Sequence, residues 1–247
     1  MSVRPKIGVF SFSSCEGCQL QILNLEREIP AIAGLVELVN FREAMNKISD
    51  DYAIAFVEGS ITREKEVAEV EAIRKQAKIL VSLGACAHLG GVNSLKNPKP
   101  KEEWLKTVYK TTDVFTDTFE TKRVSDVVKV DYDIPGCPID KFEFVRTVFA
   151  LLAGVAPRLP DKPVCAECRV KPNPCLVEDN ELCLGSITRA GCGAICPTYG
   201  EECVACRGVL KDANIKGLTK ILNDRGHSKT AINGKLELFN LLAKIEV

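Results

Sequence analysis

The residues of this chain best suited to chemistry are its cysteines, because eight of the 12 lie close together in the second half. A hydrophobic core does not need thiols at that density. Eight thiols make two sets of four, and four thiolates are the ligands that one cubane iron-sulfur cluster requires. This stretch therefore predicts two such clusters. Its cysteines are Cys165, Cys168, Cys175, Cys183, Cys192, Cys196, Cys203 and Cys206.

The remaining four cysteines are Cys15, Cys18, Cys86 and Cys137, which lie far apart in the sequence. Taken alone, each is more simply a small buried hydrophobic residue. Only a fold could bring them together, and a third set of four would bind a third cluster. We therefore expect three sets of four cysteines.

The spacing of the eight later cysteines resembles that of bacterial two-cluster ferredoxins in its C-x3-C-P step and its C-x2-C pairs, without their compact regularity. The spacing supports two cubanes and leaves the division of ligands open. By analogy with ferredoxins, we expect one set to be Cys165, Cys168, Cys175 and Cys206, and the other to be Cys183, Cys192, Cys196 and Cys203.

Zinc is the alternative metal. The two C-x2-C pairs, Cys165 with Cys168 and Cys203 with Cys206, have the spacing of a tetrahedral site with four thiolates. The other four cysteines would then need a second site with long and uneven spacings. A zinc-stabilised structural module therefore stays a rival interpretation.

The composition is that of a globular protein without a strong electrostatic field. Of 247 residues, 46% are apolar, and 33 basic side chains cancel 33 acidic ones. This balance argues against nucleic-acid and anionic-membrane partners. We see neither a signal peptide nor an apolar run of about 20 residues that would span a membrane, so we expect a cytoplasmic protein. Clustered cysteines in a reducing compartment indicate metal or redox chemistry rather than disulfides.

The elements that must position the first four cysteines alternate between strand and helix. We expect strands at residues 6–12, 37–41, 52–57, 78–83 and 127–131, and helices at 19–28, 61–77 and 139–154. Mostly unbroken apolar strands in a βαβα order predict an α/β fold with a parallel sheet covered on both faces. Residues 93–121 are poorly periodic, and we interpret them as an insertion with a short helix.

Each of these four cysteines lies in a segment that follows an expected strand. In open parallel sheets, ligands bind beyond the carboxyl ends of the strands. Glycines at positions 17, 84 and 136 would let the backbone approach a bulky inorganic group. The expected fold thus gathers Cys15, Cys18, Cys86 and Cys137 at one edge of the sheet.

A proline-rich break at residues 156–163 marks the expected domain boundary. We predict one domain over residues 1–157 and a second over residues 158–247. The second is cysteine-rich and irregular, so bound metal is expected to supply much of its stability. Residues 209–223 and 236–245 are expected to form helices that cover the cluster region.

Four ordered motifs resemble those of a known family. They are Ser-Cys-Glu-Gly-Cys-Gln from Ser14, Phe-Val-Glu-Gly-Ser-Ile from Phe56, Gly-Ala-Cys-Ala from Gly84 and Ile-Pro-Gly-Cys-Pro from Ile134. Together they resemble the small, electron-transferring subunit of nickel-iron hydrogenases. The cysteine-rich tail is similar to the soluble cytoplasmic branch, which includes sulfhydrogenases and the NAD(P)-linked, deazaflavin-linked and heterodisulfide-reductase-linked enzymes.

The resemblance implies a flavodoxin-like first domain whose four cysteines bind the proximal 4Fe-4S cluster. The eight later cysteines would bind the medial and distal 4Fe-4S clusters. Some relatives use a histidine on the distal cluster, but the C-terminal region here has only His227, outside the cysteine block. The resemblance therefore implies ligation by cysteine alone.

Three further residues lie beside the proximal ligands. His88 is expected to line the pocket or satisfy a hydrogen bond rather than bind iron, since the set of four is complete. Glu16 is expected to be exposed or to cap a helix, with proton movement as the alternative. Glu58 is expected to hydrogen-bond around the cluster and so influence its potential.

The resemblance also implies the function. Electrons from a nickel-iron site in a separate large subunit would cross the three clusters to a flavin or iron-sulfur acceptor subunit, or run in reverse. The chain itself would then hold no catalytic residue. The alternative is a related respiratory-complex iron-sulfur subunit, but we would expect adjacent cysteines in its first loop, where this chain has Cys15-Glu-Gly-Cys18. The identity of the terminal acceptor stays open.

Overall fold

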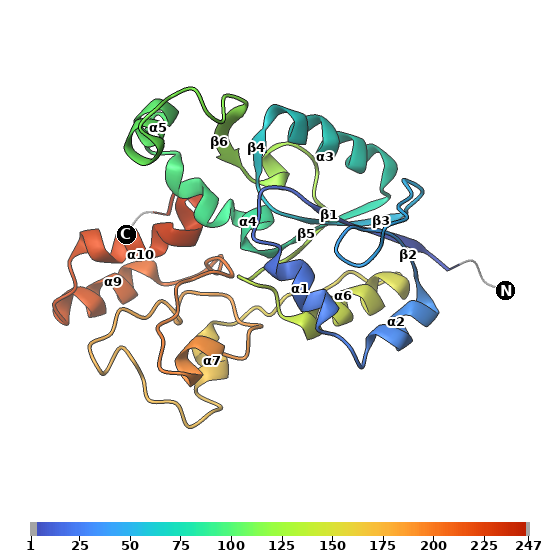
Figure 1. Cartoon of the computed structure of the whole chain (residues 1–247). Helices are drawn as coiled ribbons and strands as arrows, with labels where there is room; N and C mark the ends of the chain where they lie inside the picture. Colours follow the sequence, from blue (N-terminus) through green and yellow to red (C-terminus); the bar gives the residue numbers. More distant parts are fainter. Residues whose placement is uncertain (1–3, 246–247) are drawn as a thin grey trace. The chain divides into compact units, whose positions relative to one another are not determined.

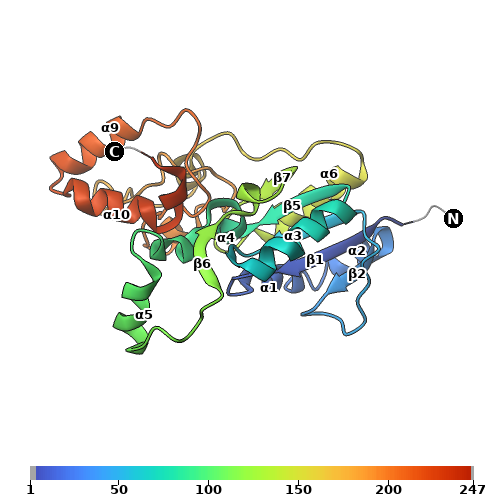
Figure 2. The ribbon, with the colours of Figure 1, turned by 90° about the horizontal axis from the view of Figure 1, so that it is seen from above.

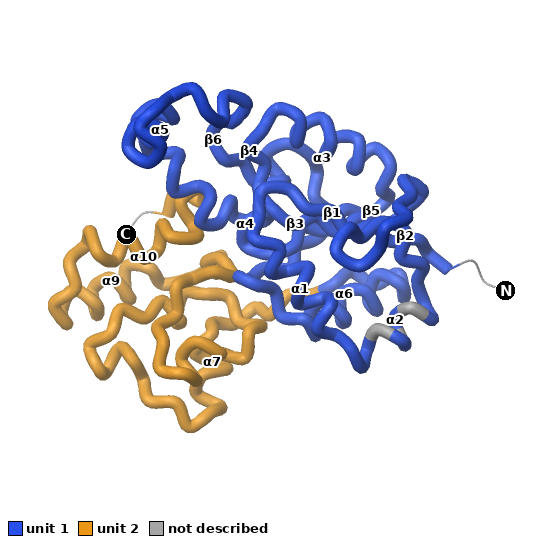
Figure 3. The backbone as a smooth tube through the Cα atoms, viewed as in Figure 1, with its two compact units in different colours: residues 1–157 blue, residues 158–247 orange. Residues whose placement is uncertain are grey.

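The structure is a computed structural model that describes residues 4–245, apart from the side chains of residues 29, 31 and 33. The chain divides into two compact units, residues up to 157 and residues from 158 on, coloured separately in Figure 3. Each unit has an apolar core of its own.

A five-stranded parallel sheet forms the centre of the first unit (Figure 1). Its strands, in spatial order, are β2 (Glu37–Phe41), β1 (Lys6–Ser11), β3 (Ile54–Glu58), β5 (Ile79–Leu83) and β7 (Tyr132–Ile134). Every pairing is parallel. This is the flavodoxin-like strand order, in which the direction of winding reverses between β1 and β3. The predicted α/β fold is therefore confirmed.

Both faces of the sheet are buried, as unbroken apolar strands require. In β3, Ile54 and Phe56 belong to one apolar cluster and Ala55 and Val57 to another. The helices α1 (Gly17–Leu23), α2 (Ile29–Leu35) and α6 (Lys141–Leu152) cover the first face, and α3 (Glu64–Gln76) covers the second (Figures 1 and 2).

A second, two-stranded sheet pairs β4 (Ile61–Arg63) with β6 (Thr118–Lys122) in antiparallel fashion. The prediction that the helix begins at Ile61 was wrong by these three residues. The Glu66 carboxylate accepts hydrogen bonds from the amides of Thr62 (2.7 Å) and Arg63 (3.1 Å). These contacts cap the helix after Arg63, so α3 begins at Glu64.

Three other predicted elements of this unit are shifted. The helix expected to be closed by Pro30 ends at Leu23, and α2 contains Pro30 in its first turn, where proline is tolerated. Cys86, expected in a loop, lies on a short helix, α4 (Gly84–Leu89). The last strand is β7 rather than residues 127–131. Just before it, the Asp131 amide donates to the Leu80 carbonyl, and the Asp131 carboxylate accepts from the Leu80 amide. Regular pairing therefore begins only after Asp131.

The expected insertion holds η1 (Gly91–Lys96), α5 (Lys101–Tyr109) and the strand β6, followed by η2 (Val124–Asp126). One short helix was expected there. The additional strand, β6, pairs with β4, which lies more than 50 residues earlier in the sequence. A pairing over that distance could not be predicted from a local pattern.

The second unit combines cysteine-bearing loops with short helices. These are α7 (Val164–Cys168), α8 (Ile195–Thr198), α9 (Ile215–Asp224), α10 (Lys229–Asn240) and η3 (Leu241–Ala243). Its core packs Leu184 and Ile187 from the loops against Leu222 of α9 and Leu236 of α10. The last two helices thus cover the cysteine region, as predicted, although with different boundaries. In the described part of the chain, no helix has the length and apolar character needed to cross a membrane.

Candidate metal centres

The four early cysteines follow three different strands of the large sheet. Cys15 lies between β1 and α1, and Cys18 lies in the first turn of α1. Cys86 lies on α4 directly after β5, and Cys137 follows β7. Burial raises the pKa of Cys86 to about 12, and the neighbouring Cys137 and Cys15 add to this rise. The pKa of Cys18 is likewise raised, by burial first, with Glu58 and Cys86 contributing. The fold therefore brings these four thiols into one electrostatic neighbourhood.

At two glycines beside these thiols, the backbone leaves no space for a side chain. A Cβ atom added to Gly84, whose φ is +80°, would lie 2.4 Å from the Sγ atom of Cys18. One added to Gly91 would lie 3.0 Å from the Sγ atom of Cys86. The Ala85 amide also donates to the Gly136 carbonyl at 2.7 Å, which ties the loops after β5 and β7 together. Glycine thus permits a close approach of backbone to sulfur.

Glu58, at the end of β3, lies beside the same group. Only 2% of its surface is exposed. Its two carboxylate oxygens accept hydrogen bonds from the amides of Cys18 (3.0 Å) and Gln19 (3.3 Å). Burial raises the pKa of Glu58 despite these bonds, which act in the opposite direction. The carboxylate satisfies two amides in the first turn of α1 that have no partner within the helix.

His88 and Glu16 take up different positions. The Nδ1 atom of His88 lies 3.0 Å from the Oδ1 atom of Asp133, which also accepts a hydrogen bond from Ser82 at 2.5 Å. Glu16 is exposed, adopts the left-handed conformation with φ of 63°, and precedes α1. Its backbone carbonyl accepts from the Leu20 amide at 3.0 Å, so it is the backbone that caps the helix.

Four of the later cysteines line one cavity of about 530 Å³ in the second unit. They are Cys165, Cys168, Cys175 and Cys183. Burial raises the pKa of Cys165 to about 11, and charges on Cys183, Cys168 and Cys175 add to the rise. The cavity is therefore a place where four thiols face a common space. Cys183 stands where the ferredoxin analogy placed Cys206.

The other four later cysteines are Cys192, Cys196, Cys203 and Cys206. Burial raises the pKa of Cys203 to about 12, and Cys183 and Cys206 add to the rise. Burial also raises the pKa of Cys196, with Cys192 as the next contribution. The Cys203 amide donates to the Sγ atom of Cys183 at 3.4 Å, so Cys183 lies between the two sets.

The backbone is strained beside these thiols. Ala194 and Ala205 adopt the left-handed conformation, with φ of 50° and 56°, although neither is glycine. Each lies within two residues of a cysteine. Such conformations cost about 1–3 kcal/mol each and persist where surrounding structure enforces them, often at functional sites.

Polar residues that the sequence reasoning missed lie among the later cysteines. Asn173 donates from Nδ2 to the Sγ atom of Cys168 at 3.5 Å. The Sγ atom of Cys203 lies 3.4 Å from the Thr188 hydroxyl. The only signal in the sequence was their nearness to cysteines, which many other polar residues in this region share.

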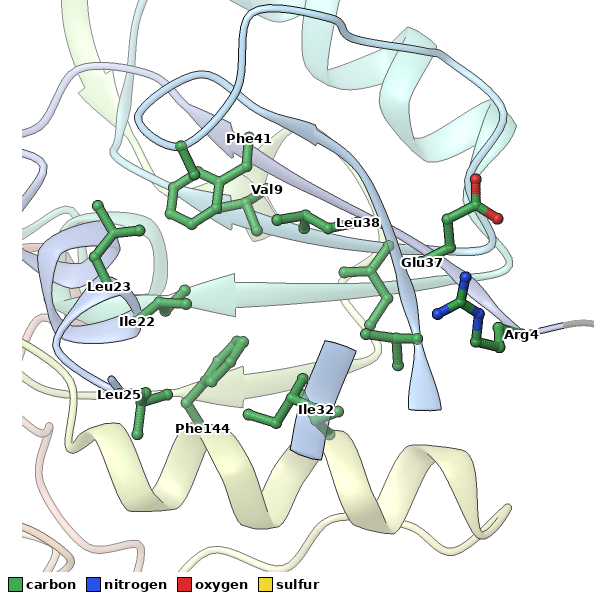
Figure 4. A pocket seen from close by; sticks show the side chains of 14 residues that line it. Arg4, Val9, Ile22, Leu23, Leu25, Ile32, Glu37, Leu38, Phe41 and Phe144 are labelled. Atoms are coloured by element: carbon green, nitrogen blue, oxygen red, sulfur yellow. The ribbon is translucent and has the colours of Figure 1, made fainter. Parts of the chain in front are cut away.

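A separate apolar cavity of about 340 Å³ lies between the sheet and the helices α1, α2 and α6 (Figure 4). Its walls include Ile22, Phe41 and Phe144, with Arg4 and Glu37 at one end. None of the cysteines lines it. Most of its lining residues belong to the apolar core of the first unit.

The residues present fit iron-sulfur clusters on three grounds. The donors are all thiols, and glycine makes room beside some of them. Four thiols line one cavity, and four others influence one another after three strands. Burial favours the neutral thiols in the chain alone, whereas a bound cationic metal reverses that preference and deprotonates them. In residues 4–245, no group of three or more His, Cys, Asp or Glu side chains is arranged to hold a single metal ion.

Comparison with known proteins identifies the family of this chain. Residues 15–151 match the family described as NADH ubiquinone oxidoreductase, 20 Kd subunit. Sulfhydrogenase 2 subunit delta of Pyrococcus furiosus is 33% identical over 89% of this chain and 92% of its own length. A subunit of the vhu F420-non-reducing hydrogenase of Methanocaldococcus jannaschii is 32% identical over 97% of this chain and 95% of its own.

Solved structures agree with the sequence relatives. A chain of an NAD+-reducing [NiFe]-hydrogenase in the H2-reduced state superimposes with a TM-score of 0.57 and 25% identity. The match covers 64% of this chain and 96% of that one. The fold and the cysteine groups thus define an electron-transfer protein of the hydrogenase and respiratory-oxidoreductase class. Within that class, the chain belongs to the family of small subunits of nickel-iron hydrogenases. It is a subunit of a hydrogenase complex.

Proposed function

We propose that this subunit carries three 4Fe-4S clusters and relays electrons between a nickel-iron large subunit and an acceptor subunit. The observation that carries the proposal is the convergence of Cys15, Cys18, Cys86 and Cys137 from the ends of three strands, with Gly84 pressed against Cys18. A relative from Archaeoglobus profundus is named as an iron-sulfur subunit of an F420-non-reducing hydrogenase, which supports the choice of metal.

The division of the later cysteines is proposed from the cavity rather than from the ferredoxin analogy. One set is Cys165, Cys168, Cys175 and Cys183, which line the same space. The other is Cys192, Cys196, Cys203 and Cys206. This division exchanges Cys183 and Cys206 relative to the sequence-based expectation. It follows chain order, so each set lies on one continuous stretch.

The protein's own contribution is to hold and insulate the thiols. When bound, the clusters supply one-electron donors and acceptors. Glu58 fixes the amides at the start of α1 and so fixes Cys18. The glycines at 84 and 91 keep other side chains away from the sulfur atoms of Cys18 and Cys86, and the apolar clusters of the two units bury Cys18, Cys183 and Cys203.

The partners are inferred from relatives. The large subunit would contain the nickel-iron site, and the acceptor would be a flavin or iron-sulfur subunit, because relatives are named as NAD-reducing, F420-non-reducing and sulfhydrogenase subunits. We propose a cytoplasmic location, as the resemblance to the soluble branch of the family implies. The acceptor is identified by purifying the complex and sequencing the polypeptides that remain bound.

Metal analysis of anaerobically purified protein tests the proposal. It predicts about 12 iron and about 12 sulfide per chain, since each cubane holds about four of each. A zinc module predicts a colourless protein with two or three zinc ions at about four thiolates each. A folded, iron-free protein from oxygen-free cells would refute the relay.

The respiratory-complex alternative is tested by activity. The family matched by residues 15–151 takes its description from an NADH ubiquinone oxidoreductase, but this chain separates its first two cysteines by Glu16 and Gly17. A hydrogenase complex oxidises hydrogen with a dye as acceptor. A complex that lacks nickel and shows no hydrogen-dependent dye reduction would favour the alternative.

A further inference from the structure

Asn173 holds its side-chain amide between two groups of the second unit. Its Nδ2 atom lies 3.5 Å from the Sγ atom of Cys168 and 3.2 Å from the Oγ1 atom of Thr198. Thr198 lies on α8, the helix that contains Cys196. Asn173 thus connects a cysteine of one set to the helix that carries a cysteine of the other.

The hydrogen bonds of Thr198 determine which way the amide faces. The Thr198 hydroxyl donates its single proton to the carbonyl of Ala194 at 2.8 Å. Its oxygen can then only accept, and it accepts from Asn173 and from the Nζ atom of Lys171 at 3.2 Å. The nitrogen of Asn173, rather than its oxygen, must therefore face Thr198. The second proton on that nitrogen is available to the sulfur of Cys168.

Lys171 keeps this arrangement in place. Its Nζ atom also donates to the carbonyl of Gly193 at 2.6 Å, next to Ala194. The segment containing Lys171 and Asn173 is therefore bonded at several points to the start of α8. Two prolines, Pro172 and Pro174, flank Asn173 and restrict its backbone. The amide is held in position rather than free to rotate.

We propose that Asn173 raises the redox potential of the cluster bound by Cys168, with Thr198 as its positioning residue. This inference rests on the proposed function, because it needs an iron-sulfur cluster in the cavity that Cys168 and Asn173 both line. Hydrogen bonds to cluster sulfurs are an established determinant of potential. The reduced site carries one more negative charge, so a donor to sulfur stabilises it more than the oxidised site. Asn173 is half-buried, which strengthens the contact.

The test is an EPR-monitored redox titration of the intact complex. Cys175→Ser first identifies the signal of this cluster. In Asn173→Leu, which keeps the shape but removes the donor, the potential of that signal should fall by about 59 mV, equivalent to about a tenfold change in the ratio of reduced to oxidised sites. Asn173→Asp should lower it at least as far. The matched control is Asn223→Leu, an exposed asparagine on α9.

Thr198 provides the test of positioning. Thr198→Val removes the acceptor that orients the amide, so the potential should fall in the same direction but by less. Thr198→Ser keeps the hydroxyl and should restore the wild-type value. Equal potentials in wild type, Asn173→Leu and Thr198→Val would overturn the inference, as would a fall of the same size in the Asn223→Leu control.

If the variants lose iron, a measurement on the wild-type complex tests the hydrogen bond from Asn173 to the cluster. With asparagine labelled with nitrogen-15 in its side chain, pulsed EPR should detect a weak nitrogen coupling to the reduced cluster, and its absence would refute the hydrogen bond. The proposed function fails separately: if the EPR spectra of the wild type and of Cys175→Ser are the same, the cluster itself is refuted.

Discussion

Gly84 and Cys18 approach each other so closely that a methyl group on Gly84 would lie 2.4 Å from the Cys18 sulfur. Gly84 begins the helix that carries Cys86, and Cys18 lies in the first turn of α1. The contact therefore joins two segments that hold thiols of the same set. The φ of +80° at Gly84 adds a second reason for glycine at this position.

Gly84→Ala should disrupt this site. The clash with sulfur and the left-handed backbone should together destabilise the protein by about 1–3 kcal/mol, and iron content should fall by about four atoms per chain. Iron analysis and the midpoint of thermal unfolding measure both effects. The matched control is Gly34→Ala on α2, where the added Cβ would meet nothing within 4 Å. Full iron content in Gly84→Ala would contradict this account of the site.

Glu58→Gln should weaken the start of α1. The amide group of glutamine would turn one donor toward the backbone donors of Cys18 and Gln19, leaving at least one of them unsatisfied. The expected cost is about 1–3 kcal/mol, measured by chemical unfolding, with faster loss of iron to a chelator. Glu43→Gln, an exposed substitution of the same kind, should leave both quantities unchanged. Identical behaviour of the two variants would show that these hydrogen bonds contribute nothing.

Cysteine replacements should separate the two later sets. Cys175→Ser and Cys183→Ser should each alter one and the same EPR signal, because both residues line a single cavity. Cys206→Ser should alter a different signal, shared with Cys192→Ser. If Cys206→Ser instead affects the same signal as Cys175→Ser, the division expected from the ferredoxin analogy is correct and the one proposed from the cavity is wrong.

Asp131→Asn should reduce stability in a way that depends on pH. Burial alone would raise the pKa of Asp131, but hydrogen bonds from Arg74 and from the amide of Leu80 outweigh it, so the pKa lies below its ordinary value of 3.8. The Arg74 contact is 2.5 Å. A lowered carboxyl pKa stabilises the folded state above pH 3.8, and this contribution disappears as the pH falls through the lower, folded-state value.

Unfolding curves of wild type and Asp131→Asn across acid pH test this prediction. At neutral pH the variant should be less stable by about 1–3 kcal/mol, and the difference should close below about pH 3.8, the ordinary carboxyl value. Asp51→Asn, which removes an exposed pair with Lys6, should change little at any pH. A constant difference between Asp131→Asn and wild type would exclude the linkage.

The main strands of the sheet could be read from the sequence because each is a short apolar run and both faces are buried. The strand β4 could not be predicted, because its three residues, Ile61 to Arg63, run directly into the charged pattern of α3. α2 was missed because Pro30 suggested the end of a helix, whereas the same residue is equally compatible with a beginning.

The N-terminal group of thiols followed from the sequence by a general rule about parallel sheets, which needs only the order of strands and loops. The division of the later thiols had no such rule. Cys183 and Cys206 lie in irregular segments, where the path of the chain depends on residues such as Ala194 and Ala205 adopting conformations that their types do not indicate. Neither these conformations nor the grouping of the thiols leaves a local pattern in the sequence.

The order of strands has a consequence for biosynthesis. Cys15 and Cys18 follow the first strand of the sheet, but the fourth thiol, Cys137, follows the edge strand β7, which is the last to be translated. During synthesis, Cys15 and Cys18 therefore leave the ribosome before the other four strands of the parallel sheet have been made. Under the proposed function, the N-terminal group can bind a cluster with all four thiols only after the sheet has folded, because Cys137 comes after β7. The four thiols from Cys165 to Cys183 lie on one short stretch and do not depend on the sheet.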